Sequence, residues 1–144
     1  MILDKENQYS DAQALTVTAA STSSIDHVIP VNNLGVGEPM VVQINLDVAA
    51  DNTTGNETYV AALQVDDNAS FTSAATIASV TIPAGSAAGS RFFINVPPNT
   101  SFERYSRLNY TLGGTTPTVT VTAHLVPLSF VQNEQVYADN ITIS

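Results

Sequence analysis

The fold class is decided by one stretch of sequence, Met40-Val41-Val42-Gln43-Ile44-Asn45-Leu46-Asp47-Val48. Every second position of this stretch holds an apolar side chain, and polar side chains occupy most of the positions between them. Successive side chains of a strand point to opposite faces of a sheet. The alternation therefore predicts a β-strand with one face buried in a core.

The same period of two recurs along most of the chain. Alternating apolar residues predict further strands at 59–65, 78–82, 92–96, 108–112 and 119–125, with a short early strand at 28–31 and an irregular last strand at 136–143. Glycine- and proline-containing turns separate these runs, for example Pro97-Pro98 and Gly113-Gly114. About eight short strands at regular spacing predict an all-β fold, an antiparallel jelly roll or β-sandwich.

The first part of the chain lacks this pattern. The Thr-, Ser- and Ala-rich run at 16–24 has little to bury, so we expect an extended N-terminal arm at 1–24, with room for one short strand, and a jelly-roll domain at 25–144. A short helix capped by Ser10 or Asp11 and a frayed terminus are alternatives for this segment. Four apolar residues that a free tail would not need favour an arm that contacts something: Ile2, Leu3, Tyr9 and Leu15.

Composition excludes several classes of function. Only 12% of the residues are charged, about half of the usual share of roughly 25%, and the formal net charge is −9. Nucleic-acid binding depends on Lys and Arg at phosphates, and the chain has 4 such residues against 13 acids. An anionic membrane surface is disfavoured for the same reason. With 0 cysteines there are no disulfides or thiolate sites.

Targeting signals are also missing from the pattern. No apolar run reaches the roughly 18 residues of a membrane helix. The start, Met1 to Gln8, is polar within four residues and does not resemble a secretory signal, so we expect synthesis in the cytoplasm.

No catalytic, cofactor or metal site is predicted. The two histidines, His27 and His124, are far apart in sequence and are interpreted as surface imidazoles. Asp66-Asp67-Asn68, or Asp47 with Asp51, could gather oxygen ligands for calcium, but neither fits the spaced calcium-loop motif. No Gly-x-Ser-x-Gly elbow indicates a hydrolase.

Three arginines are candidates for contact with a partner. Arg91, Arg104 and Arg107 carry three of the four positive charges. Because Arg forms bidentate pairs with carboxylates and is common at interfaces, each could pair with an internal acid or with an acid of a neighbouring subunit.

The N-terminal segment resembles a known family. The stretches that carry the resemblance are Met1-Ile2-Leu3-Asp4, Tyr9-Ser10-Asp11-Ala12-Gln13-Ala14-Leu15-Thr16, Ala19-Ala20-Ser21-Thr22 and Ile25-Asp26. They are similar to the start of the Bbp16-like group, capsid cement proteins of tailed bacteriophages. Over the rest of the chain the similarity is one of length and texture.

The resemblance implies a structural role. It implies a jelly-roll decoration protein on the outer surface of a phage head, with the major capsid protein and further copies of itself, as a dimer or trimer, as partners. It brings no catalytic residue and no cofactor. The matching positions, especially Tyr9, Asp11, Gln13 and Leu15, are then the candidate capsid contacts, and deletion of residues 1–15 should abolish binding but leave the domain folded. A fibre, adhesin or carbohydrate-binding module is the alternative, and an enzyme is disfavoured.

Overall fold

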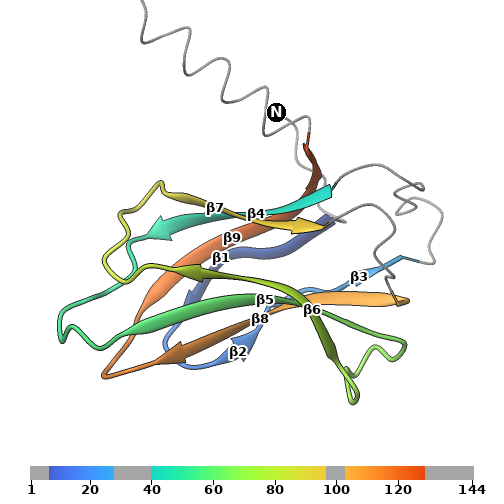
Figure 1. Cartoon of the computed structure of the whole chain (residues 1–144), viewed down its shortest axis with the longest axis horizontal. Helices are drawn as coiled ribbons and strands as arrows, with labels where there is room; N and C mark the ends of the chain where they lie inside the picture. The colour runs from blue at the N-terminus through green and yellow to red at the C-terminus, as the bar shows by residue number, and fades with distance from the viewer. Residues whose placement is uncertain (1–6, 28–39, 97–102, 129–144) are drawn as a thin grey trace, which may run out of the picture.

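The structure is a computed structural model that describes residues 7–27, 40–96 and 103–128. Within these ranges nine β-strands form two antiparallel sheets, and the predicted all-β fold is confirmed. The first sheet has the order β1 (Gln8–Leu15), β9 (Val119–Pro127), β4 (Met40–Val48), β7 (Arg91–Val96). The second has the order β2 (Ala19–Ala20), β8 (Tyr105–Gly113), β5 (Thr58–Asp66), β6 (Ala75–Ile82), with β3 (Ile25–Asp26) also pairing with β8. Figure 1 shows the sheets as two stacked layers.

The strand order is that of a jelly roll. β2 and β3 both lie along β8 and act as one interrupted strand, which leaves eight strands in two four-stranded sheets. The chain passes from one sheet to the other between β1 and β2, β3 and β4, β4 and β5, β6 and β7, β7 and β8, and β8 and β9, whereas β5 and β6 form a hairpin. Strands distant in sequence therefore become neighbours, such as β1 and β9.

The core lies between the sheets and is built from the alternating apolar residues. In β4 the inward side chains of Val42, Ile44 and Leu46 are at most 1% exposed. They face the corresponding residues of β5 and β8, among them Leu63 and Leu108, in one continuous cluster. Burying each such side chain stabilises the fold by roughly 1.5–3 kcal/mol. Burial of the apolar residues that alternate in the sequence is therefore the main term that stabilises the fold.

The structure corrects the prediction for the N-terminal segment. Residues 8–15 are not an arm or a helix: they form β1, an edge strand hydrogen-bonded to β9. Residues 16–24 are attached as well, because Ser21 N donates to Leu108 O (2.8 Å) and Ser23 N donates to Tyr9 O (3.0 Å). The expected arm at 1–24 therefore does not hold for residues 7–24, and the sandwich begins before residue 25.

β1 is irregular, which explains why its pattern was missed. Its register with β9 shifts between Gln8 and Ser10 and again between Ser10 and Gln13, and Ala12 has φ of +46°. Such bulges bend an edge strand and discourage pairing with another chain. The strands predicted at 28–31 and 136–143 lie outside the described residues.

Candidate partner-binding surfaces

Two of the predicted contact residues belong to the core. Tyr9 is 0% exposed, and its hydroxyl shares a hydrogen bond of 2.8 Å with Ser106 Oγ of β8. Leu15 is 3% exposed and packs in the central cluster. Neither side chain offers surface to a partner, so we withdraw both as contact residues: they tie β1 to the sandwich.

The other two residues from β1 lie nearer the surface. Asp11 is exposed. Gln13 is half-buried, and its Oε1 accepts from Ser10 Oγ (2.7 Å) and Thr22 N (3.1 Å), while its Nε2 donates to Ala20 O (2.9 Å). Gln13 therefore fastens β1 of the first sheet to β2 of the second, and its side chain has a structural role within the chain.

A buried polar network joins the two sheets beside these residues. Ser106 Oγ contacts both Tyr9 Oη and His27 Nε2, each at 2.8 Å. Burial raises the pKa of Tyr9 well above its ordinary value, and burial lowers the pKa of His27 against the opposing charge of Asp26. The phenol is therefore a neutral hydroxyl at every physiological pH, and the imidazole favours its neutral form.

This network contains a Ser–His contact, between Ser106 and His27. Ser106 is 0% exposed, and its hydroxyl is also engaged by the Tyr9 phenol inside the core. A nucleophile must be reachable by a substrate carbonyl. The geometry of Ser106 and His27 is therefore that of a structural contact.

His124 departs from its predicted placement. The sequence placed it as a surface imidazole on the outer side of β9, but its side chain is only 6% exposed. It lies on the outer face of the first sheet, as its register with Gln43 of β4 requires. The prediction of two surface histidines is wrong for His124.

The three arginines have different surroundings. Arg104 pairs with Asp26 within the same chain, with Nε and Nη2 at 3.2 and 3.1 Å from the two carboxylate oxygens. Its guanidinium also lies 5.0 Å from the ring centroid of Tyr105. Of the two kinds of partner expected for Arg104, the structure therefore contains the acid of the same chain.

Arg107 and Arg91 lie on opposite sheets. Arg107 Nε donates to Gln64 Oε1 (3.0 Å), and its guanidinium lies 4.4 Å from the centroid of the Phe71 ring, so its described contacts are neutral. Arg91 is exposed on β7 opposite Asn45.

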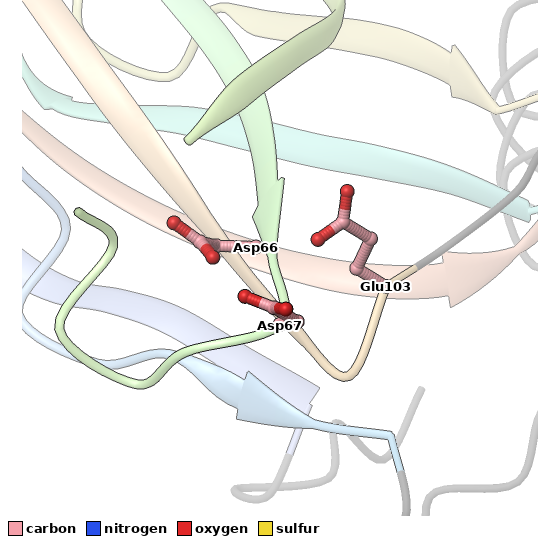
Figure 2. A group of neighbouring side chains, drawn as sticks. All are labelled: Asp66, Asp67 and Glu103. Atoms are coloured by element: carbon pink, nitrogen blue, oxygen red, sulfur yellow. The ribbon is translucent and has the colours of Figure 1, made fainter. Parts of the chain in front are cut away.

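Three acids meet at one end of the second sheet. Oxygens of Asp66, Asp67 and Glu103 lie within 4.8 Å of one another beside the end of β5 and the start of β8 (Figure 2). Asp66 is buried and uses its oxygens locally, accepting from Asn68 N (3.0 Å) and Ser73 N (2.7 Å). Burial opposes ionisation of Asp66, but these backbone bonds outweigh it and its pKa is lowered. The Asp66-Asp67-Asn68 stretch is thus explained by the turn that it builds.

The outer face of the second sheet is free of acids over three consecutive rows. Across β6, β5 and β8 these rows are Thr81–Val60–Thr111, Ser79–Ala62–Asn109 and Thr76–Gln64–Arg107, and Ala20 of β2 extends the middle row. Val60 and Ala62 are half-buried at the centre, and exposed hydroxyls surround them. We call these residues the acid-free face; its one formal charge is Arg107.

Comparison with known proteins agrees with this architecture. A model of the Bbp16 family matches residues 9–125, which extends the similarity from the N-terminal segment into β9. None of the curated proteins compared with the chain matches it. Among the described residues, no helix has the length and apolar character needed to cross a membrane. The chain belongs to the Bbp16 family, and with it to the phage-related structural proteins.

Proposed function

We propose that the protein is a capsid cement protein, which binds the outer surface of a phage head and bridges neighbouring subunits of the major capsid protein. The observation that carries the proposal is the family match over residues 9–125. The jelly-roll fold and the formal net charge of −9 support it, because an acidic protein is electrostatically better placed outside a head packed with DNA than inside it. On this proposal the protein has no catalytic role.

The acid-free face is the surface that we assign to the capsid. The described acids lie elsewhere, so docking through Val60 and Ala62 leaves them in solvent. Neutral hydroxyls and amides cost less to desolvate than charges, which favours a broad contact made of weak hydrogen bonds. Each copy contributes little on its own, but a closed lattice multiplies the effect through multivalency. Self-association as a dimer or trimer would bring two such faces to neighbouring capsid subunits.

The structure gives no support to a sugar-binding surface built on aromatic platforms. Tyr9, Tyr59 and Tyr110 are buried, and Tyr105 is half-buried beneath Arg104. Within the described ranges there is thus no exposed cluster of tyrosines on which a sugar ring could stack.

Deleting residues 1–15 is no longer a clean test, because the deletion removes β1 and two core residues. Cosedimentation with expanded heads that lack the protein is better, using wild type, Ala62→Glu in the acid-free face, and Ala14→Glu on the exposed side of β1 as the matched control. We expect saturable binding of wild type and of Ala14→Glu at a fixed ratio to capsid subunits. Ala62→Glu should bind at least about tenfold more weakly, since it buries an unpaired charge.

Two results would count against the proposal in different ways. Folded wild-type protein that does not sediment with heads would overturn the cement function. Equal binding of Ala62→Glu and Ala14→Glu would leave the function standing but exclude the acid-free face as its site.

A further inference from the structure

Arg107 carries the one formal charge of the acid-free face, and neutral groups hold its guanidinium in place. Its Nε donates to Gln64 Oε1 (3.0 Å), and its guanidinium lies 4.4 Å from the centroid of the Phe71 ring. Neither contact neutralises the positive charge, but together they fix the orientation of the guanidinium. Within the described ranges its Nη1 and Nη2 make no hydrogen bond, so both nitrogens keep their donors for a partner.

The ring that lies against Arg107 is presented by a loop with a strained backbone. Phe71 has φ of +52°, a region that bulky side chains rarely adopt. Its own N–H donates to Asn68 O (3.0 Å). The buried carboxylate of Asp66 holds the loop by accepting from Asn68 N and Ser73 N. These bonds keep the Phe71 ring, which is 9% exposed, against the guanidinium.

A second arginine near the same strand shows what Arg107 lacks. Arg104, which directly precedes β8, also lies beside an aromatic ring, 5.0 Å from the centroid of Tyr105. Its Nε and Nη2, however, donate to the two carboxylate oxygens of Asp26. In the part of the chain that the structure describes, no carboxylate forms an ion pair with Arg107. Asp66 at the end of β5 directs its oxygens to the amides of its own loop instead.

We propose that Arg107 is the anchor at which the acid-free face binds a carboxylate of the major capsid protein. The inference rests on the proposed cement function and names the chemical group that its surface recognises, the side chain of an aspartate or glutamate held by Nη1 and Nη2. Arginine presents its N–H groups in a planar fork that matches the two oxygens of a carboxylate. Because the guanidinium is already oriented, little side-chain entropy remains to be lost on binding.

The surroundings of Arg107 favour the capsid over a second copy of the chain as the source of the carboxylate. Every copy has a formal net charge of −9, so two copies repel each other as they approach. The row of Arg107 continues through Gln64 and Thr76, and the next row begins with Asn109, so the surface around it is neutral. A contact here desolvates one charge, which a carboxylate compensates. Such a pair fixes the register and orientation of the protein on the capsid.

Cosedimentation with heads that lack the protein tests the anchor, with Arg107→Gln as the test variant and Arg104→Gln as the matched control. Both variants lose one positive charge, so their net charges are equal. Arg107→Gln should bind at least about tenfold more weakly than Arg104→Gln, because it leaves the capsid carboxylate without its partner. This difference should narrow as NaCl rises from about 50 mM to about 500 mM, since salt screens a partly exposed ion pair. A loss caused by altered packing would not depend on salt in this way.

Cross-linking identifies the partner group directly. Arg107→Lys and Arg104→Lys each place an amine where the guanidinium lies, and a water-soluble carbodiimide joins amines to carboxylates in contact with them. On heads, Arg107→Lys should give a product with the major capsid protein that peptide mass mapping locates at an aspartate or glutamate, whereas Arg104→Lys should not. Lys5 is the chain's own lysine, so the wild type supplies the background.

The outcomes separate this inference from the proposed function. Folded wild-type protein that does not bind heads overturns the cement function, and the anchor with it. If the wild type binds, equal affinities of Arg107→Gln and Arg104→Gln, or a difference that salt does not change, overturn the anchor and leave the function standing. A cross-link from Arg107→Lys to another copy of the chain, or no product beyond the wild-type background, overturns the anchor as well.

Discussion

The hydrogen bond between Ser10 and Tyr110 gives the sharpest test of where the sandwich begins. Ser10 lies in β1, is 0% exposed, and its Oγ is 2.7 Å from Gln13 Oε1 and 2.8 Å from Tyr110 Oη. Tyr110 belongs to β8 of the other sheet and is 2% exposed. The bond therefore crosses the core and joins residues 100 positions apart in sequence. An arm that lay outside the fold could not make it.

A double-mutant cycle measures this contact. Ser10→Ala leaves the Tyr110 hydroxyl buried without the partner it has in the structure, and should lower the free energy of unfolding by about 2 kcal/mol. Tyr110→Phe removes that hydroxyl while Ser10 keeps Gln13, and should cost about 1 kcal/mol. In the double mutant no phenol is orphaned, so its total cost should be about 2 kcal/mol instead of about 3, a coupling of about 1 kcal/mol.

The assay is urea unfolding followed by far-UV circular dichroism, with unchanged m-values as the sign that only stability has changed. With an m-value of about 2 kcal/mol/M, Ser10→Ala should shift the midpoint by about 1 M. Ser24→Ala, an exposed serine of the same segment, is the control and should stay within about 0.5 kcal/mol of wild type. Our account of β1 is refuted if Ser10→Ala behaves like this control, or if the two single effects simply add.

Three further predictions concern a turn, a histidine and a loop. Gly114 has φ of +92°, and a Cβ at this position would clash with the backbone oxygen of Asn56. Gly55 has a similar φ (+85°) but open space where its Cβ would lie, so Gly114→Ala should melt well below Gly55→Ala; equal melting temperatures would contradict this. Because burial lowers the pKa of His27, the folded state binds fewer protons than the unfolded state, so this contribution to stability is complete above about pH 6.5 and declines as the pH falls below it. Between pH 7.5 and pH 5.5 the free energy of unfolding should fall less for His27→Gln than for the wild type; equal decreases would exclude His27 as the cause. Asp66→Asn should speed hydrogen exchange at the Ser73 amide, which donates to this carboxylate, and an unchanged rate would show that the bond does not hold the loop.

The sequence was a sufficient guide wherever one face of a strand is buried and the other is wet. β5 and β8 fit this description, and their apolar residues recur at every second position. The jelly-roll fold could also be predicted, because only a few topologies arrange about eight short antiparallel strands in two packed sheets.

Where the prediction failed, the cause was a departure from regular alternation. In β1 both Tyr9 and Ser10 are buried and both Asp11 and Ala12 are exposed, because the bulges and the positive φ of Ala12 interrupt the period of two. Ser10 is moreover a polar residue inside the core, and only its partner Tyr110, far along the chain, explains why. No local pattern contains that information.

The exposure of the outward residues of the first sheet could not be predicted for a different reason. Position in a strand tells which face a residue such as His124 or Gln43 occupies, but not whether another part of the chain covers that face. Both residues alternate with core residues as surface residues do, yet they are 6% and 3% exposed. The partner of Arg104 could likewise not be predicted from the sequence, because only the pairing of β3 with β8 brings Asp26 beside it.

The outer faces of the two sheets differ in how well they suit the contact that the cement proposal requires. At one end of the first sheet the outward residues Val41 and Val126 are buried, and toward the other end the sheet carries Asp47 and Arg91, so this face is poorly suited to a broad neutral contact. The acid-free face has the opposite character. Between copies, the net charge of −9 opposes close approach, but at physiological salt the repulsion fades over about 8 Å. Copies docked through the acid-free face would therefore take their spacing from the capsid lattice, and binding to heads should depend less on salt than a contact built on charge pairs would.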